Sequence, residues 1–559
     1  MRLLSEGRAR VRALIARVPS IAQLQHLDLF LDSWEKNLIG ALSFLAVVAF
    51  VGFFWSIHLV HTTTAPAHGG DFQEVLVGAP HHINPVFAVT DTDRTLTNIV
   101  FLPLCDSFNH GVAALADHCD IATNLKSATV TLGSRIWHDG KPVTVSDVFF
   151  TIHTMQDKSV GSPWRGLANQ VSVTSDAQGH IIISAKQPIP DLKTLLSLGV
   201  VPEHAWAPID PSTMQSDALN LHPIGTGAFA FKNLSLGPDG TPQGITFEAF
   251  SKFSPHEPYL EELDFRIADD NSSSYDMFRT RQVDAIFVSD PAQTEELVKR
   301  DVHRYELTPS AVVSLFFNPI QNSKFKNPDV RDAFALAIDR ASIVKTGLKG
   351  NGTPLRAPFP ESLIKQPLIV EPDADAAAAA ALFKKAAFNT NASSTLTLGV
   401  PNLPTYATIA DQIKSQLAAF GISITIAPIG SGTKTGALLS YDLLLLGQDY
   451  GAVGNPFPYW HSTASGEAGA NYARYQTKEV DSWLEQLQLD GRPDMRAGLL
   501  KQLNARLVND TPAVFLFQPT YQYYVANKVQ GVDISAANDP SERFETASEW
   551  FIATRRVSK

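Results

Sequence analysis

An uninterrupted apolar run near the N-terminus constrains this chain more than any other feature of its sequence. Leu38–Val60 spans 23 residues without Lys, Arg, Asp or Glu, and about 20 apolar residues suffice to cross a bilayer. Trp34 and Trp55 lie near its ends, where spanning helices often carry interfacial aromatic residues. The sequence therefore predicts a transmembrane helix over residues 38–60, with a buried core helix as the alternative.

The position of this run favours an uncleaved anchor over a signal peptide. The apolar region of a signal peptide has about 7–15 residues and begins near the N-terminus, whereas 37 residues precede this run. The basic flank predicts a cytoplasmic segment over residues 1–37 and an outer location from residue 61 onward. Residues 8–31 have the apolar spacing of an amphipathic helix on the inner leaflet, and a simple topology-setting flank explains them equally well.

The outer part of the chain has the composition of a folded acidic protein. The whole chain of 559 residues carries a net charge of −11 and is 44% hydrophobic, which excludes an intrinsically disordered chain. The acidic balance argues against nucleic acid as a partner, because such proteins usually present a basic face. Residues 61–70, HTTTAPAHGG, are interpreted as a short polar linker.

The chain contains only two cysteines, Cys105 and Cys119, and both lie on the expected outer side. An oxidising compartment favours a disulfide between them, worth roughly 3 kcal/mol for a loop of about 15 residues. Two unpaired buried thiols are the alternative. A scaffold held together by many disulfides and a Cys-rich metal site are both excluded.

Short β-type runs alternate with helical runs through the outer part. The predicted strands are Ala128–Leu132, Ile181–Ala185, Ile245–Phe250, Thr395–Val400 and Ile422–Ala427, and the predicted helices are Val145–Gln156, Pro328–Ile338, Tyr406–Phe420, Val480–Leu487 and Pro493–Val508. Thr144 and Asp147 are placed to cap the first of these helices. This mixture predicts an α/β (mixed α+β) fold.

No catalytic signature is present in the sequence. It has no HExxH, GxSxG, Walker or Rossmann motif. His81 and His82 form the tightest histidine pair of the outer part, but adjacent residues of a strand point to opposite faces. We therefore expect no enzyme, no metal site and no cofactor.

Seven segments, taken in order, match a known pattern. They are GAPHHINPVFAVTDTDRTLTNIVF from residue 78, RIWHDGKPVTVSDVFFTI at 135–152, HPIGTGAFAF at 222–231, the segment at 316–354 containing VRDAFALAIDR, IADQIKSQLAAFGISITI at 409–426, YDLLLLGQDYGAVGNPFPYWHS at 441–462 and ANYARYQTKEVDSWLEQ at 470–486. This series resembles the family 5 extracellular solute-binding proteins, the oligopeptide-, dipeptide- and nickel-binding components of ABC importers. The resemblance covers nearly all of residues 72–559, and the N-terminal membrane helix departs from the family's usual secreted or lipid-anchored form.

The resemblance implies a two-lobed clamshell of the periplasmic binding protein type, preceded here by one transmembrane helix. Lobe one is expected over residues 71–310 and again over 515–559, with lobe two over 311–514. The implied function is an extracytoplasmic binding protein, tethered to a bacterial cytoplasmic membrane with its large domain outside. It would bind peptides or a related small solute in the cleft and present them to an ABC permease and its ATPase subunits.

Two loops match the segments that line the cleft in this family. The first gives His82, Ile83 and Asn84. The second gives Gly447, Gln448, Asp449, Tyr450, Asn455, Tyr459 and Trp460. Peptide-binding relatives carry GWxGDxxDP in the second loop, and an Asp there pairs with the ligand's α-ammonium; that position falls on Ala452 in this chain.

The departure in the second loop leaves several alternatives open. Asp449 is the candidate to replace the missing acidic anchor, and a turn residue capping its own loop is the equal alternative. Tyr459 and Trp460 either contact ligand or fill the core of lobe two. A tethered sensor or scaffold without transport, and a binder of a non-peptide solute such as a nickel complex, are the alternative functions.

Overall fold

The computed structural model describes residues 32–106, 111, 113–289, 301–364, 369–388, 395–430, 433, 435–451, 453–466, 469–535 and 537–558. Most of the expected cytoplasmic segment 1–37 and the position of Ala452 lie outside these residues. The chain divides into two compact units. The first comprises Met1–Pro66 with Thr554–Lys559, and the second comprises Ala67–Ala553.

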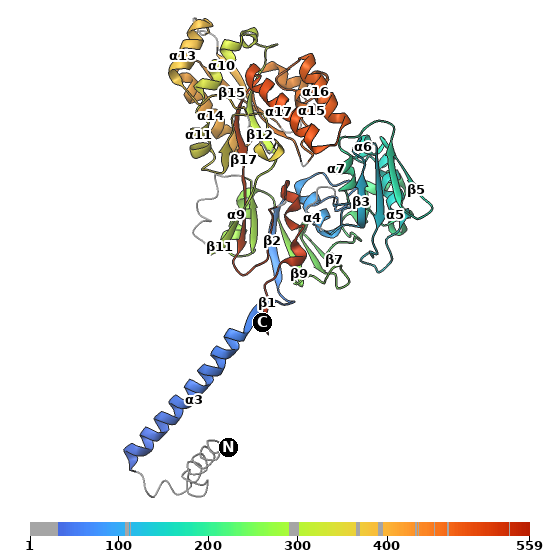
Figure 1. The fold of residues 1–559 in the computed structure, drawn as a ribbon, viewed down its shortest axis with the longest axis vertical. Helices are drawn as coiled ribbons and strands as arrows, with labels where there is room; N and C mark the ends of the chain where they lie inside the picture. The colour runs from blue at the N-terminus through green and yellow to red at the C-terminus, as the bar shows by residue number, and fades with distance from the viewer. Residues whose placement is uncertain are drawn as a thin grey trace, which may run out of the picture. The chain divides into compact units, whose positions relative to one another are not determined.

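The described part of the first unit contains a long apolar helix and a two-stranded ribbon. Helix α3 (Ser33–His61) contains one stretch, Ser33–Ser56, that is long and apolar enough to cross a membrane. The segment interpreted as a linker instead contains strand β1 (Thr62–Pro66), which pairs antiparallel with β19 (Thr554–Ser558) (Figure 1). Consecutive β-branched threonines favour this extended backbone, but the sequence alone does not reveal a partner strand almost 500 residues away.

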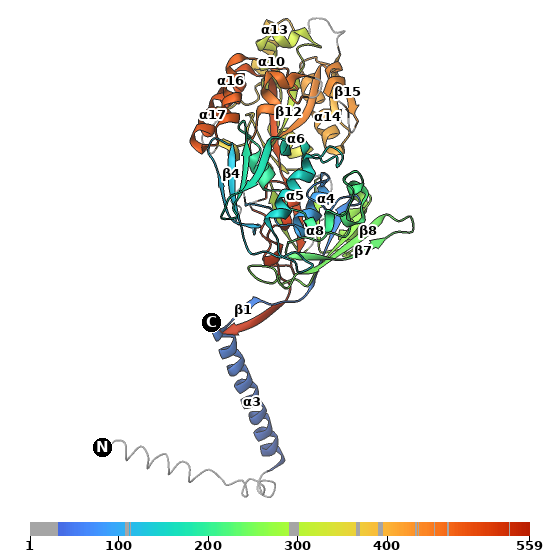
Figure 2. The same cartoon turned by 90° about the vertical axis from the view of Figure 1, so that its right-hand side faces the viewer.

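The second unit contains two lobes, each built on its own large sheet (Figure 1). The seven-stranded sheet of lobe one has the order β11-β18-β10-β2-β9-β8-β7. Its strands are β2 (Asp71–Val77), β7 (Phe229–Leu236), β8 (Pro242–Ala249), β9 (Glu262–Ala268), β10 (Ala285–Val288), β11 (Val302–Leu307) and β18 (Tyr521–Ala526). Helices α4 (Asp91–Val100) and α9 (Asn271–Arg279) contact strands of this sheet. Figure 2 shows the β7–β8 hairpin extending at one end of this sheet.

A smaller antiparallel sheet of four strands completes lobe one. Its order is β3-β4-β6-β5, with β3 (Ala116–Ile121), β4 (Ser127–Leu132), β5 (Val171–Ser175) and β6 (Ile181–Ala185). The helices nearby in sequence are α5 (Val145–Gln156), α6 (Arg165–Ala168), α7 (Leu192–Leu196) and α8 (Glu203–Trp206). The predicted cap of α5 is confirmed, because the N–H of Thr144 donates to Asp147 over 2.8 Å.

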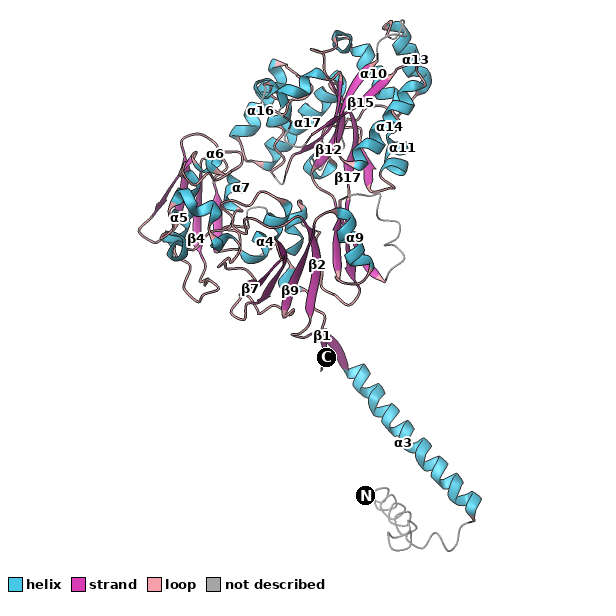
Figure 3. Ribbon diagram, turned by 180° about the vertical axis from the view of Figure 1, so that it is seen from behind, coloured by secondary structure: helices cyan, strands magenta, loops and turns pink. Residues whose placement is uncertain are grey.

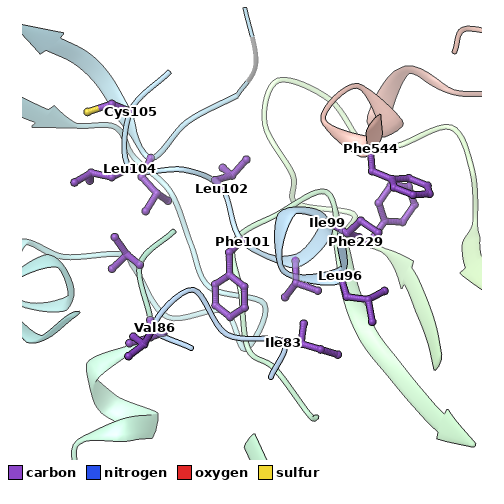
Figure 4. Close-up of a cluster of buried hydrophobic side chains, with 14 of the residues drawn as sticks. Ile83, Val86, Leu96, Ile99, Phe101, Leu102, Leu104, Cys105, Phe229 and Phe544 are labelled. Atoms are coloured by element: carbon purple, nitrogen blue, oxygen red, sulfur yellow. The ribbon is translucent and has the colours of Figure 1, made fainter. Parts of the chain in front are cut away.

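One hydrophobic core joins the parts of lobe one. Side chains from distant segments meet in it, as Figure 4 shows for Ile83, Phe101, Phe229 and Phe544. A disulfide links Cys105, a member of this core, to Cys119 in β3. The turn at Gly225 and Gly227 closes against α4, where a Cβ on Gly225 would lie 2.0 Å from the carbonyl oxygen of Val100. Glycine is therefore required there by close backbone approach.

Lobe two is a six-stranded sheet covered by helices on both faces (Figure 3). Its order is β13-β17-β12-β16-β14-β15, with β12 (Ala311–Phe317), β13 (Gly352–Pro354), β14 (Leu396–Pro401), β15 (Ile424–Ile429), β16 (Leu443–Asp449) and β17 (Ala513–Pro519). One core contains α10 (Pro328–Ala337), α13 (Ala376–Lys385) and α14 (Pro404–Ala418), together with residues near α11 (Arg340–Ser342). The other contains α12 (Glu361–Ile364), α15 (Phe457–Trp460), α16 (Lys478–Leu489) and α17 (Pro493–Asp510).

The chain changes lobe at two crossings. It leaves β11 after Leu307 and enters β12 at Ala311, so the expected boundary 310/311 falls between these strands. The expected return at 514/515 falls inside β17, which belongs to the sheet of lobe two throughout, and the sheet changes only between Pro519 and Tyr521. The buried run AVFLF is continuous across the expected boundary, so its hydrophobicity gave no sign of the later crossing.

Candidate functional site

A charged cavity of about 300 Å³ lies between the two lobes. Lobe two contributes Asp449, at the end of β16, and Gly451. Lobe one contributes α4, the chain after it and the segment that includes the 3-10 helix Pro540–Phe544. Its charged lining residues are Arg94, Asp106, Asp539, Glu542 and Glu545.

A buried ion pair holds the lobe-one wall in place. The guanidinium of Arg543 donates to the carboxylate of Glu74 through Nε, over 3.0 Å, and to Thr95 of α4 over 3.2 Å. Asn98 of α4 donates to the backbone oxygen of Ser541 over 3.1 Å. These bonds dock the C-terminal segment onto α4, and they thereby place Asp539 3.2 Å from Arg94.

A second cavity of about 200 Å³ adjoins the first within lobe one. Thr97 and Glu545 belong to both cavity walls. The second is lined by polar and apolar groups in similar proportion, and its apolar members include Phe229, Phe253 and Phe544. The two cavities together form a charged space between the lobes and an adjoining recess within lobe one.

A third cavity, of about 420 Å³, lies beside the two crossings. The strand residues Val313, Phe517 and Tyr521 line it, together with Tyr406 at the start of α14. The first turn of α9, from Asn271, supplies polar groups from lobe one. This crossing-side cavity is thus also shared between the lobes.

The exposed edge of β16 runs between the interlobe cavities. Strand β12 pairs with the whole of β16, but β14 pairs only with Leu443 and Leu444. Among the described residues no strand pairs with 445–449 on the side of β14. Tyr450 donates its N–H to Ser310 and so directs its main-chain groups toward β12. Successive residues of a strand direct these groups to opposite sides, so the N–H and C=O groups of Gly447 and Asp449 point to the open edge.

The two edge residues differ in what occupies their main-chain groups. Tyr459 takes both groups of Asp449, accepting its N–H over 3.2 Å and donating to its carbonyl over 2.6 Å. Gly447 is exposed, and a Cβ there would lie 3.3 Å from the Tyr406 hydroxyl. The open main-chain groups are therefore those of Gly447, close to the crossing-side cavity.

Asp449 combines the two roles that the sequence left open. Its Oδ1 accepts the N–H of Gly451 over 2.8 Å, which makes it a turn residue. Its side chain also lines the charged cavity. Burial raises the pKa of Asp449 although the residue keeps solvent access; the Gly451 amide opposes this, Asp539 raises the pKa further, and Arg94 lowers it.

The first predicted loop is held by lobe one itself. The N–H groups of His81 and His82 donate to Oδ1 of Asp93 over 2.7 and 2.9 Å. Ile83 is fully buried, and the amide of Asn84 donates to Asn220 over 3.0 Å. None of these loop residues lines the three cavities, whereas Pro85 lines the charged one.

Three residues predicted from the second loop form a buried cluster behind the strand. The Tyr450 hydroxyl donates to the backbone of Pro358 over 2.8 Å and accepts the Trp460 indole N–H over 3.2 Å. Gln448 is fully buried, and its Oε1 lies 3.1 Å from the same hydroxyl. Their position favours the core alternative for Trp460.

Asn455 contacts lobe one. Its side chain hydrogen-bonds Asp191, the residue before α7, while its Oδ1 accepts from Gln488 over 2.9 Å. Arg496 binds the backbone oxygens of Val453 and Gly454 and so holds the loop. Burial raises the pKa of Asp191, with Asn455 and Arg496 acting in the opposite direction.

Most of the charged residues that line the first cavity were not predicted from the sequence. Arg94 stands inside a quoted segment but belongs to no ligand pattern, and Asp539, Glu542 and Glu545 lie in a C-terminal stretch without any motif. Their meeting depends on the Arg543–Glu74 pair, which joins residues 469 positions apart. Only a tertiary contact reveals this wall.

Comparison with known proteins identifies the family of this chain and agrees with its fold. The sequence pattern of the bacterial extracellular solute-binding proteins, family 5 Middle, matches residues 111–471. The chain therefore belongs to this family, whose members are substrate-binding proteins of ABC transporters and not enzymes.

Individual relatives agree with this assignment. The oligopeptide-binding protein AppA of Bacillus subtilis is 21% identical over 520 residues, covering 87% of this chain and 92% of AppA. The structure of CtaP, an ABC transporter substrate-binding protein of Listeria monocytogenes, matches with a TM-score of 0.74 at 22% identity, covering 87% of this chain and 99% of CtaP. AppA in complex with a nonapeptide matches with a TM-score of 0.68 at 20% identity, covering 88% of this chain and the whole of AppA.

Proposed function

We propose that this chain is the membrane-tethered binding protein of an ABC importer, and that it takes up peptides in the interlobe cleft. The observation that carries the proposal is the open edge of β16, which leaves the main-chain groups of Gly447 unpaired by any described strand between the interlobe cavities. A peptide is the ligand whose own backbone repeats the donors and acceptors of a strand, and adding it to an open edge satisfies both partners. The nonapeptide bound to AppA supports this choice of ligand.

Asp449 is the proposed anchor for the peptide's α-ammonium. Its carboxylate stands two residues beyond Gly447 and lines the charged cavity. A charge-assisted hydrogen bond at that point would fix which end of the peptide meets lobe one. Ala452, which occupies the family's usual acidic position, has no side chain able to compete for the ammonium.

Lobe closure is the proposed signal to the permease. In the part of the chain that the structure describes, two segments connect the lobes, residues 308–310 and Thr520, and such short crossings suit a hinge. A peptide that touches both β16 and the α4 wall binds the closed state better than an open one, and it therefore shifts the population toward closure.

The proposed tether is helix α3. Its apolar stretch Ser33–Ser56 meets the length of a membrane span, and its side chains lie exposed, including Trp34 and Trp55. The basic residues before it favour a cytoplasmic N-terminus. This topology leaves the two lobes outside, where an importer must collect its solute.

The test uses the full chain in lipid nanodiscs and a library of short peptides, with binding measured by native mass spectrometry and calorimetry. Gly447→Pro removes the open N–H, and because that group faces away from β12 the sheet should survive. We expect peptide affinity to fall by about tenfold, the value of one lost bond of about 1.4 kcal/mol. His81→Ala, whose exposed side chain lies outside the cavities, is the matched control.

The outcomes separate clearly. Wild-type protein that binds no peptide of the library overturns the proposed function. Peptide binding that Gly447→Pro leaves unchanged, in a variant with native circular dichroism, overturns the role of the strand edge.

A further inference from the structure

The walls of the charged cavity and its recess carry a strong excess of negative charge. Their acidic residues are Asp106, Asp449, Asp539, Glu542, Glu545 and Glu549, and the single base among the described lining residues is Arg94. One peptide α-ammonium balances one of these carboxylates. A cleft walled by low-dielectric protein concentrates such a field and attracts cations.

Part of this charge is already used inside the protein. Arg94 lies 3.2 Å from Asp539 and 2.8 Å from Asp91. Glu542 accepts the N–H of Asn538 over 2.7 Å. The carboxylate of Glu549 lies 2.6 Å from His256. These contacts fix the geometry of the acids, and Arg94 is the one permanently positive side chain among the described lining residues.

The recess combines aromatic and acidic side chains, and together these suit a long basic side chain. Phe229, Phe253 and Phe544 are all at least nine-tenths buried, and they form the aromatic part of the recess wall. Glu545 and Glu549 line the same recess. The side chains of Arg and Lys combine an apolar stem with a charged head, and an aromatic wall adds a favourable contact with the cation.

Thr97 of α4 supplies an independent sign that a ligand group is expected here. The residue is 5% exposed and belongs to the walls of both cavities. Its hydroxyl makes no hydrogen bond with any residue that the structure describes. A buried hydroxyl without a partner costs free energy, and a guanidinium or ammonium entering the recess would give it a donor.

We propose that the recess behind Thr97 is a specificity subsite for a basic peptide side chain, so that this protein prefers cationic peptides. The proposal rests on the proposed function, because it presumes a peptide in the cleft. The α-ammonium then meets Asp449, and an Arg or Lys side chain passes the phenylalanines toward Glu545.

The experiment compares arginine with citrulline, which has nearly the same shape but no charge. Alanine pentapeptides carrying either residue at position 1, 2 or 3 are titrated by calorimetry into the full chain in nanodiscs. At one position we expect arginine to bind at least tenfold more tightly than citrulline. That preference should shrink as salt is raised from 50 to 500 mM.

Two variants locate the effect. Glu545→Gln should reduce the arginine preference several-fold while leaving the affinity for the citrulline peptide unchanged. Asp276→Asn makes the same change of net charge at an exposed site on α9, and it should leave the preference intact. An equal loss in both variants would reduce the effect to overall charge and overturn the subsite.

The failure of this inference differs from a failure of the proposed function. If arginine and citrulline peptides bind equally at all three positions, the basic subsite is wrong and peptide binding stands. If neither series binds, the proposed function itself fails. If a glutamate series binds as well as the arginine series, the charge argument is wrong.

Discussion

The two loops that resemble the family's cleft-lining segments differ in how far the protein itself occupies their hydrogen-bonding groups. In the lobe-one loop, the N–H groups of His81 and His82 end on the buried carboxylate of Asp93, and Ile83 fills the core. In the lobe-two loop, Gly447 is exposed on an open strand edge and Asp449 lines a cavity. A resemblance therefore locates a segment near a cleft without saying which of its atoms remain available to a ligand.

This difference has a physical basis in the two loops' neighbours. The lobe-one loop lies directly before α4, and a carboxylate from the first turn of that helix collects its N–H groups. The lobe-two loop follows β16, and no described strand pairs with the end of β16 on the side of β14. There the Tyr459 hydroxyl binds the main-chain groups of Asp449 instead. The comparison predicts that changes to the first loop affect folding and changes to the second affect binding.

The largest effect is expected at Asp93. Asp93 is 1% exposed, and Asp93→Ala leaves the N–H groups of His81 and His82 without their acceptor. Each unsatisfied donor costs about 1–3 kcal/mol. We expect a loss of about 3 kcal/mol in the free energy of unfolding, measured with urea. The affinity of the remaining folded protein for peptide should be unchanged.

Asp276→Ala is the control for this stability measurement, because Asp276 is exposed and its pair with Arg279 spans one helix turn. Such surface pairs contribute about 0–1 kcal/mol. If Asp93→Ala unfolds at the wild-type urea concentration, or if it weakens peptide binding without loss of stability, the first loop does not serve folding in the way its bonds to Asp93 indicate.

The sequence was sufficient for the family and for several of the elements, and insufficient for the cleft. The strand Ile181–Ala185 and the helix Val145–Gln156 were predicted with their observed bounds, because each depends on local periodicity and capping. The wall around Arg94 and Asp539 was not predicted, since a buried ion pair between distant segments assembles it. The same reason hid the pairing of β1 with β19.

An intermediate effect is expected at Asp449, and pH reveals it. Its pKa is raised in the free protein, mainly by burial, and a bound ammonium would favour the charged form. Peptide affinity should therefore be complete above that raised pKa and should fall as the pH drops through it. Asp449→Asn should lower affinity about tenfold at pH 7 and remove this dependence, as measured by calorimetry from pH 7 down to pH 4.

N-acetylated peptides supply the control for Asp449. They lack the ammonium, so the wild-type protein and Asp449→Asn should bind them equally. Equal affinity of the wild-type protein for free and acetylated peptides would instead leave Asp449 as a turn residue only.

The smallest effect is expected at Asn455, which sharpens the comparison because it faces the other lobe. Asn455→Asp would place a second carboxylate against Asp191, whose pKa burial already raises. Two carboxylates that share a site cannot both ionise without cost, so the contact between lobes should weaken at neutral pH. We expect a threefold to fivefold loss of peptide affinity at pH 7, and the loss should disappear as the pH falls and one carboxyl takes up a proton.

The double variant decides whether this loss acts through the lobe contact. Asp191→Asn removes the opposing charge, so adding it to Asn455→Asp should restore most of the lost affinity. The double-mutant cycle then gives a coupling energy of about 1 kcal/mol. Absence of coupling would mean that Asn455 does not act through Asp191, and that its contact with lobe one does not account for the loss of affinity.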